Sequence, residues 1–532
     1  MLKNKVVLIG LLAFVLYGGS LWWTASVYGE GENSQGEKIT YTIADSTGDW
    51  GYPSPYACYS RGPGYVRMSF IFDTLAWKNE KGFTPLLARS WEYDQEENAY
   101  TFFLRKGVTW HDGVDFTAED VVFTFNYIKK HPISWVDSSI VEKTIEVDLY
   151  TVKVYLRESY APFLSNIAGT LPILPKHIWQ KIENPQDFRE DEALIGTGPY
   201  RLLDYDKAQG SYLYQAYQNY YLGKPEIEKI RFIKVSEQMA SASLKRGEVN
   251  ASAVPPEIVD ELKEKGFSII TSSGAWNAKL MFNYKKELLS SKEFRQALAY
   301  AINREEIVKI TQRGYAVLGS PGLLPPSEEY WYNSHIEQYP YNSHKAKAIL
   351  ESLGYHIEDG YYGKDGQKLE LELLTSPKFL RVAELISQQL EKIGITVDLR
   401  SLESKTLDMK VGSWKFDLAI SGHGGLCGDP SILNKVILGK GFNSARYHKN
   451  ETLNTLLVSQ VHQMEKEKRR DIIWKIQEIY AEEIPTLTLY YPIWYWAHDG
   501  TINLYYTPGG LASGIPIPLN KLCFLGTSAD SG

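Results

Sequence analysis

Cysteine is scarce in this sequence, which holds only Cys58, Cys427 and Cys523 among 532 residues. No two of them form a CxxC pair, so the spacing typical of a structural zinc site is missing. The odd number leaves at least one thiol outside any disulfide within the chain. No cysteine precedes Cys58, which excludes a lipoprotein anchor on a signal-peptide cysteine.

The motifs of common catalytic and nucleotide sites are also missing. The chain contains neither a GxSxG nor an HExxH sequence. Gly196 and Gly198 lie in IGTGPYRLL, but no Lys-Ser/Thr pair follows them to complete a phosphate-binding loop. His111 and Asp112 are of the residue types that act as general acid and base, but adjacent side chains rarely converge on one substrate atom. We therefore expect a protein that is not an enzyme and binds no cofactor.

An excess of basic residues is absent as well. The net charge is −7, from 57 basic and 64 acidic residues, which argues against a nucleic-acid partner. Hydrophobic residues make up 44% of the chain and charged residues 23%, which is typical of a globular protein. A chain of this length exceeds one ordinary domain and predicts two or three. The 37 tyrosines and 14 tryptophans are abundant and offer large, partly polar contact surfaces, although most should serve packing.

The N-terminal segment is typical of an export signal. Lys3 and Lys5 precede VVLIGLLAFVLYGGSLWW, an apolar run at residues 6–23. The run is just short of a standard spanning helix, so it is either cleaved near Ala25 or kept as an N-terminal anchor. Residues 29–38 form a polar tether. In both cases we expect the body of the protein to lie outside the cytoplasm, in the periplasm or at the cell surface.

Residues 110–130 predict a turn followed by a helix. Gly113 suits the turn, Thr117 is a candidate N-cap, and Asp120 stands at the third helical position, as in a capping box. The apolar residues Val121, Phe125 and Ile128 then share one face, so the helix should pack on a sheet.

The rest of the body alternates between strand and helix patterns, which favours an α/β fold. Strands are expected at 39–45, 101–105, 152–156, 230–235, 279–283, 369–374, 395–399, 416–420 and 486–491. Helices are expected at 238–247, 291–302, 379–393, 453–464 and 470–483, with a further helix capped by Asn303. Residues 163–177, which contain Pro172 and Pro175, predict loops and turns.

Three stretches carry a family resemblance. They are the string from WEYDQEENAYTFFLRKGVTWHDG to FTAEDVVFTFNYI at 91–128, GTGPY at 196–200, and FRQAL with AINR at 294–304. The chain resembles the extracytoplasmic solute-binding proteins of ABC importers, family 5, the oligopeptide, dipeptide and nickel class. The resemblance covers roughly residues 39 to 520.

The resemblance implies an α/β, two-lobed periplasmic-binding-protein fold of the class II type with an inserted subdomain. Residues 38–80, 196–275 and 496–532 would form lobe I, residues 81–195 lobe II, and residues 276–495 lobe III. The first and last parts of the body then share lobe I, which would allow Cys58 and Cys523 to pair. GTGPY would mark the return from lobe II to lobe I.

The loop SGHGGLCGDP at 421–430 faces the cleft between the lobes in this family. Peptide-binding members often carry a Trp after the first Gly and an Asp four residues before the Pro, which pairs with the peptide's amine. Here those positions hold His423 and Leu426, which weakens the interpretation as a dipeptide carrier. Gly424 and Gly425 would let the backbone approach a ligand closely. Asp429 is expected to cap the next helix.

Other candidate ligand-binding residues are aromatic: Trp276 and Tyr65 as walls of the pocket, and Trp494, with Trp496, as weaker candidates. His423 and Cys427 raise the possibility of metal ligation. We favour a hydrogen-bonding or stacking role for His423 and a buried filler role for Cys427. No protein metal site is therefore predicted, which leaves room for a metal carried as a chelate.

The resemblance implies a monomeric carrier that captures an oligopeptide-like solute by hinge closure in the inter-lobe cleft. It would deliver the solute to a membrane permease whose ATPase supplies the energy. A nickel-chelate or oligosaccharide carrier on the same fold is one alternative, and an exported hydrolase is another. A sensory or chaperone role without transport is a further one.

Overall fold

The computed structural model describes residues 40–59 and 62–526, which belong to one compact unit. The predicted signal or anchor and its tether, residues 1–37, lie outside the described residues. Within the described ranges, no helix has the length and hydropathy needed to cross a bilayer.

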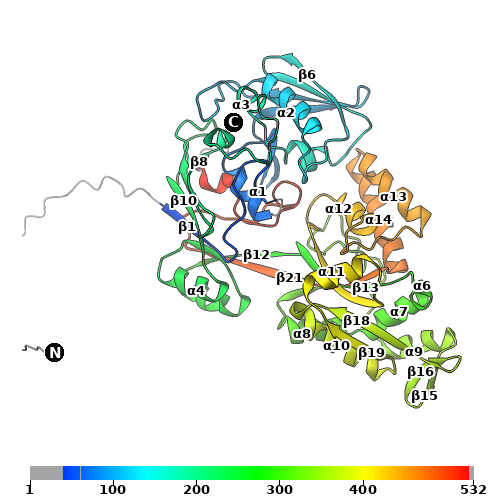
Figure 1. Ribbon diagram of the computed structural model, residues 1–532. Helices are drawn as coiled ribbons and strands as arrows, with labels where there is room; N and C mark the ends of the chain where they lie inside the picture. Colours follow the sequence, from blue (N-terminus) through cyan, green and yellow to red (C-terminus); the bar gives the residue numbers. More distant parts are fainter. Residues whose placement is uncertain (1–39, 60–61, 527–532) are drawn as a thin grey trace, which may run out of the picture. The chain divides into compact units, whose positions relative to one another are not determined.

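A mixed twelve-stranded sheet dominates the described part of the chain (Figure 1). Its order is β19 (Thr396–Ser401), β18 (Glu370–Thr375), β20 (Leu418–Gly424), β13 (Trp276–Phe282), β21 (Thr486–His498), β11 (Ala251–Val254), β1 (Thr40–Asp45), β10 (Lys229–Lys234), β9 (Ser211–Ala216) and β8 (Tyr200–Asp206). Strands β12 (Ser268–Ser273) and β14 (Ala316–Leu318) also pair with β21. Two parallel groups, β10-β1-β11 and β19-β18-β20, lie toward opposite ends of this order.

Strand β21 joins the two groups. Its first half pairs antiparallel with β13, and its second half pairs with β11 and β12. Figure 1 shows β21, in orange, extending from β13 to β12. The sequence predicted a strand only over 486–491, with Trp494–Trp496 after it. The structure instead continues the strand to His498, because that aromatic run has partners on both sides and aromatic residues suit a pleated surface.

A second sheet contains the family signature. Its order is β4 (Ala88–Asp94), β5 (Ala99–Leu104), β7 (Thr151–Leu156) and β6 (Val141–Asp148), and helix α2 (Ala118–Lys130) packs against it. The predicted capping box is present, with the Thr117 amide donating to the Asp120 carboxylate at 3.0 Å. Val121, Phe125 and Ile128 are buried in one core with the inner faces of β5 and β7. The prediction for residues 110–130 is confirmed.

The smaller elements complete the fold. Two small sheets pair β2 (Ala76–Asn79) with β3 (Gly82–Pro85), and β15 (His356–Glu358) with β16 (Tyr361–Lys364) and β17 (Gln367–Lys368). The shorter helices are α1 (Gly62–Ser69), α3 (Lys176–Trp179), α4 (Glu237–Lys245), α5 (Val259–Glu264), α6 (Glu287–Ser290), α8 (Arg304–Thr311), α11 (Ser404–Gly412) and α12 (Ile432–Leu438). The longer ones are α7 (Lys292–Ala301), α9 (Ser343–Ser352), α10 (Leu380–Lys392), α13 (Glu451–His462) and α14 (Lys466–Glu483).

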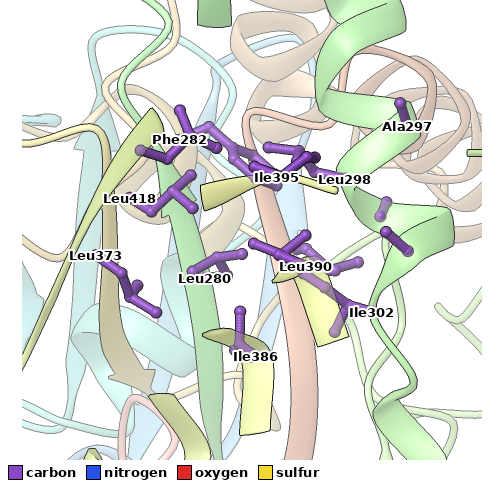
Figure 2. Packing of buried hydrophobic residues seen from close by; sticks show 14 of the residues in the cluster. Leu280, Phe282, Ala297, Leu298, Ile302, Leu373, Ile386, Leu390, Ile395 and Leu418 are labelled. Carbon is purple, nitrogen blue, oxygen red and sulfur yellow. The ribbon is translucent and has the colours of Figure 1, made fainter. Parts of the chain in front are cut away.

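The largest core lies between strands β13, β18 and β20 and helices α7 and α10 (Figure 2). Leu280 and Leu418 from the strands meet Leu298 from α7 and Leu390 from α10, and all four are fully buried. Burying such side chains stabilises the fold by about 1.5–3 kcal/mol each. The helical stripes predicted from the sequence for 291–302 and 379–393 are therefore confirmed as core faces.

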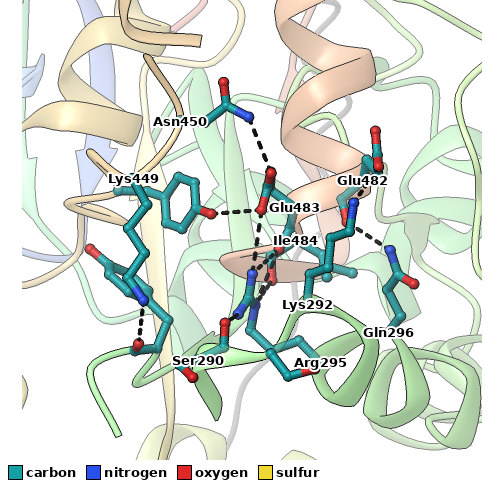
Figure 3. A network of polar contacts seen from close by, with 12 residues as sticks. Ser290, Lys292, Arg295, Gln296, Lys449, Asn450, Glu482, Glu483 and Ile484 are labelled. Atoms are coloured by element: carbon teal, nitrogen blue, oxygen red, sulfur yellow. Dashed lines mark hydrogen bonds and ion pairs between the residues drawn. The ribbon is translucent and has the colours of Figure 1, made fainter. Parts of the chain in front are cut away.

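Arg295, in the FRQAL stretch, holds α7 against the end of α14 (Figure 3). Its buried guanidinium donates to the carbonyls of Leu289 and Ser290 at 2.8 and 2.9 Å and to those of Glu483 and Ile484. The Glu483 carboxylate also accepts a hydrogen bond from Tyr447, at 2.6 Å. This part of the family pattern thus serves the fold rather than the ligand.

The structure corrects the prediction for residues 163–177, explains the glycines of GTGPY, and leaves Cys58 and Cys523 unpaired. Residues 163–177, predicted as loops and turns, include a π-helical turn at Leu164–Ala168 and the short helix α3. Gly196 and Gly198 are needed for close approach, because an added Cβ at either would lie 2.0–2.6 Å from the Ile71 carbonyl oxygen. Cys58 and Cys523 are free thiols in the structure, although both pack against the same core. The lobe boundaries stay a prediction.

Candidate functional site

His423 lies on β20, opposite Asn277 of β13. Its backbone amide donates to the Asn277 side chain at 3.0 Å, and its ring Nδ1 donates to the Gly424 carbonyl at 2.7 Å. Burial, and next the nearby charge of Lys279, lower the pKa of His423 to about 4. The ring is therefore neutral near pH 7 and is engaged in a hydrogen bond.

The residues around His423 form one neighbourhood. Gly424 pairs with Trp276, whose ring stacks on Phe379 with centroids 5.8 Å apart. Gly425 has φ +84° and donates from its amide to the Ala275 carbonyl at 3.0 Å. Leu426 is completely buried in a core beside α12, α13 and α14. Its side chain therefore presents no surface to a solute.

The other two predicted residues lie elsewhere. Tyr65 is buried, stacks on Trp77, and donates from its hydroxyl to the Thr170 carbonyl at 2.9 Å. Trp494 lies on β21 with 37% of its surface exposed. The structure thus brings together His423, Gly424, Gly425, Leu426 and Trp276. Tyr65 packs instead in the core that contains β1, and Trp494 pairs with Ser272 of β12.

The cavity that bridges the predicted lobes has a volume of about 450 Å³. Its lining comes from the β2–β3 hairpin, the turn at 164–168, segments 327–331, 428–430 and 508–509, and the start of α14. The lining residues are Lys78, Gly82, Phe83, Ser165, Ser327, Glu328, Glu329, Tyr330, Trp331, Gly428, Asp429, Pro430, Lys466, Pro508 and Gly509. None of the seven predicted ligand-binding residues is among them, but the end of the predicted 421–430 loop is.

Lys78 organises one wall of this cavity. Its buried ammonium donates to the carbonyls of Gly509, Gly510 and Ala512 at 3.2, 3.3 and 3.1 Å. Burial lowers the pKa of Lys78 to about 8, while the charges of Asp429 and Glu328 oppose that shift. All three of its N–H groups can be satisfied this way, so Lys78 fixes the 509–512 loop.

Asp429 and Arg469 make a buried, two-pronged ion pair beneath the cavity, with N–O distances of 2.9 and 2.6 Å. Burial alone would raise the pKa of Asp429, but Arg469, followed by Ser431, lowers it overall. Asp429 accepts the Ser431 amide at 2.8 Å just before α12, whereas the N-cap position is Ser431 itself. The expectation that Asp429 caps this helix therefore missed its main partner, Arg469.

Glu328 is the unusual carboxylate of the cavity. It is half-buried, and burial raises its pKa to about 7, against the opposing effects of a hydrogen bond with the Cys427 thiol and the charge of Lys78. Burial likewise raises the pKa of Cys427 well above its usual range, so the thiol is a poor nucleophile.

A second set of contacts lies beside lining residues Ser165 and Pro430 of the cavity. The Ala161 amide donates to the Val461 carbonyl at 2.7 Å, Ser159 donates to the His462 carbonyl at 2.9 Å, and Asn166 donates to Ser431 at 3.0 Å. We call these residues, 159–166 with Ser431 and 461–462, the clasp. The clasp joins the element group of β4–β7 to helices α12 and α13.

A smaller cavity of about 190 Å³ lies at the carboxyl ends of β1, β10 and β11. Its lining includes Trp496 and the Arg67–Asp45 ion pair, whose N–O distance is 2.6 Å. Every lining residue falls within predicted lobe I. The larger cavity is the better candidate for a solute site because it alone of these two involves elements from all three predicted lobes.

Across the described ranges, no group of three or more His, Cys, Asp or Glu residues could hold a metal ion.

Sequence reasoning missed Lys78, Glu328 and Arg469. Each lies in a segment whose local pattern predicts only a strand, loop or helix, and they meet only through tertiary folding. The proline pair at 325–326 marks a turn before Glu328, but nothing local shows that this turn enters a cavity.

Comparison with known proteins identifies this arrangement. The family model described as "Bacterial extracellular solute-binding proteins, family 5 Middle" matches residues 82–444. The dipeptide-binding protein of Escherichia coli K12 is 30% identical over 373 residues, covering 65% of this chain and 68% of that protein. The oligopeptide-binding protein AppA of Bacillus subtilis 168 is 29% identical over 414 residues, covering 74% and 75%.

A solved structure agrees. NikZ from Campylobacter jejuni, in complex with Ni(L-His), superposes with a TM-score of 0.73 at 24% identity, over 90% of this chain and 98% of that one. This likeness shows the fold, which is the two-lobed binding-protein fold that the sequence predicted. The chain belongs to the bacterial extracellular solute-binding proteins of family 5.

Proposed function

We propose that this protein is the extracytoplasmic binding component of an ABC importer, and that it captures a peptide-like solute in the 450 Å³ cavity. The observation that carries the proposal is the composition of that cavity: its walls come from all three predicted lobes, so movement of the lobes opens or closes it. The relatives named as dipeptide- and oligopeptide-binding proteins support a peptide as the solute.

The cavity has the chemistry of a binding site. Aromatic surfaces from Phe83, Tyr330 and Trp331 line it beside a small number of charged groups, as in most small-molecule sites. The lining carboxylate of Asp429 is neutralised by Arg469, and the Cys427 thiol is held protonated by burial. This arrangement favours binding without turnover, so we assign no catalytic step.

Strand β21 and the connection from β12 to β13 serve as the hinge in this proposal. Both cross from one parallel group of strands to the other, and β13 shifts register against β21 at Ala278–Lys279. The loaded form then delivers its solute to a membrane permease. We further propose that the chain acts as a monomer, and that residues 1–37 export it or tether it to the membrane.

The test is a thermal-unfolding screen of the full-length chain with di- to pentapeptides, nickel with and without histidine, and oligosaccharides. A solute that binds only the folded state raises the unfolding midpoint with its concentration. Peptides should raise the midpoint in a saturable manner. A shift with nickel–histidine alone, or with oligosaccharides alone, would replace the peptide by that class on the same fold.

Retention of the peptide separates a carrier from a hydrolase. After prolonged incubation with the protein, the bound peptide should be recovered intact by mass spectrometry. Cleaved peptide would show an exported hydrolase instead.

A further inference from the structure

Three carboxylates line the 450 Å³ cavity, and they differ in what neutralises them. Asp429 has its two-pronged pair with Arg469. Glu329 is exposed to solvent. Glu328 is half-buried, and no ion pair joins it to a lysine, arginine or histidine of the described residues. It is therefore the lining carboxylate that gains most from an incoming positive charge.

The groups that face Glu328 cannot supply that charge themselves. The Lys78 ammonium acts on Glu328 from a distance and is held by the carbonyls of Gly509, Gly510 and Ala512. Arg469 is committed to Asp429. Lys466 lies at the exposed rim, with its ammonium 4.2 Å from the centre of the Tyr330 ring.

The Cys427 thiol interacts with Glu328, but it is a weak donor that does not neutralise a carboxylate, and it also donates to the Ser273 carbonyl at 3.5 Å. Burial penalises a charged carboxylate, and this raises the pKa of Glu328 to about 7. An ionised Glu328 without a counter-charge destabilises the folded protein, because a partly desolvated charge without a partner is unfavourable. A ligand that supplies a positive charge removes this cost.

We propose that Glu328 receives a primary ammonium group of the solute. This inference rests on the proposed function, because it assumes that the solute occupies this cavity. It narrows the solute class to molecules with a free, positively charged amine. An ammonium placed against Glu328 makes charge-assisted hydrogen bonds that an N-blocked molecule cannot make.

Glu328 would then bind the amine, a role that the family resemblance places in the 421–430 loop. Leu426 stands where an amine-binding Asp was expected, and its side chain is buried in a core. Glu328 comes from a different segment, yet it contacts Cys427, the residue next to Leu426. The Glu328 carboxylate thus lies beside the same loop.

The amine dependence should vary with pH. Ammonium binding needs the ionised form of Glu328, whose pKa is about 7, whereas a peptide's α-amino group stays protonated at that pH and below. Affinity for a free-amine peptide should therefore fall as pH drops from 7.5 to 5.5, by up to about tenfold per unit below 7. The nearby charged groups Lys78, Asp429, Arg469, Glu329 and Lys466 are unchanged in a Glu328→Gln variant, which should show a flat profile.

The experiment is isothermal titration of the full-length chain with di- to penta-alanine and the N-acetylated form of each. For the wild-type protein, the free-amine form should bind on the order of 10- to 100-fold more tightly than its acetylated twin. Glu328→Gln should abolish that preference, and Glu328→Asp should keep part of it. Glu264→Gln, at an exposed glutamate of α5 outside the cavity, is the matched control and should behave as wild type.

The outcomes separate this inference from the function on which it rests. Equal binding of free and acetylated peptides to the wild-type protein would overturn the role of Glu328 and leave the peptide carrier standing. A preference that survives in Glu328→Gln, with an unchanged unfolding midpoint, would overturn it too. Failure of every peptide, free or blocked, to bind would overturn the proposed peptide function and this inference together.

Discussion

Two of the places where the predicted lobes of this protein meet use different chemistry. At the hinge, the backbone of β21 pairs with β13 in one half and with β11 and β12 in the other. At the clasp, the contacts are a few hydrogen bonds, such as Ser159 to His462 and Asn166 to Ser431, together with the packing of Met464 against the core of the β4–β7 sheet. A shared strand is costly to break, whereas each exposed or half-buried side-chain hydrogen bond contributes only about 1 kcal/mol.

This difference suits a protein that must open without unfolding. In the proposed mechanism, the hinge keeps the lobes in register throughout, and the clasp supplies a small, reversible preference for the closed form. Changes at the hinge should therefore alter stability, and changes at the clasp should alter the lifetime of the bound solute.

The largest effect is expected at the centre of the hinge strand. Tyr495 pairs with Val254 on one side and Thr271 on the other. Tyr495→Pro removes the backbone N–H and places a ring inside the sheet, which should cost about 3 kcal/mol or more. Urea unfolding should show a strongly lowered midpoint or no folded protein.

Trp494→Ala is the control for that variant, because Trp494 is the adjacent residue and is 37% exposed. The free energy of unfolding of this variant should stay within about 1 kcal/mol of the wild-type value. If Tyr495→Pro unfolded at the wild-type urea concentration, the shared strand would not be what holds the halves together.

The next effect is a stabilisation in the interior of the same sheet, where β13 pairs with β21. Lys279 on β13 is completely buried beside Thr488 of β21, and its ammonium has no hydrogen-bond partner among the described residues. Burial lowers the pKa of Lys279 to about 7. Lys279→Met should therefore raise the free energy of unfolding at pH 7 by roughly 3 kcal/mol.

The pH dependence gives this prediction its sign. Between pH 7 and about 10.4 the unfolded chain holds the Lys279 proton while the folded chain does not, so wild-type stability rises with pH in that window. The advantage of Lys279→Met should shrink across the same range in urea unfolding. Lys263→Met, at an exposed lysine, should change neither quantity; a constant advantage at every pH would mean that packing, not charge, is responsible.

Local patterns in the sequence predicted much of the fold. The Thr117–Asp120 cap and the Phe294–Leu298 stripe depend on neighbours within a few residues, and the structure confirms both. The length of β21 was underestimated, because residues 494–496 are strand only through pairing with β11 and β12.

The site was harder to predict, because its chemistry depends on pairs of residues that are far apart in the chain. The predicted 421–430 loop does come after a strand, but residues 421–424 continue that strand as β20 through their pairing with β13, so the loop begins only at Gly425. The end of the loop lines the cavity. The partner of Asp429 is Arg469, forty residues later, and Glu328 approaches from a hundred residues earlier. A motif scan ranks residues by position in a pattern, whereas burial and pairing decide which carboxylate remains available.

The smallest expected effect belongs to the clasp. Asn166 donates to Ser431 at 3.0 Å and to the Tyr160 hydroxyl at 3.3 Å. Asn166→Ala should weaken the closed form by about 1 kcal/mol, which is roughly a fivefold faster release of a bound peptide in stopped-flow measurements. The unfolding midpoint of the solute-free chain should hardly change, and Asn184→Ala, at an exposed residue, should leave both quantities at wild-type values.

Combining Asn166→Ala with Ser159→Ala tests whether the clasp acts as a sum of separate contacts. The two side chains bond to different partners, Ser431 and the His462 carbonyl, so their effects on the release rate should multiply. A lowered midpoint with an unchanged release rate would place these residues in ordinary packing. The hinge and the clasp would then both govern stability, and neither would govern the release of the solute.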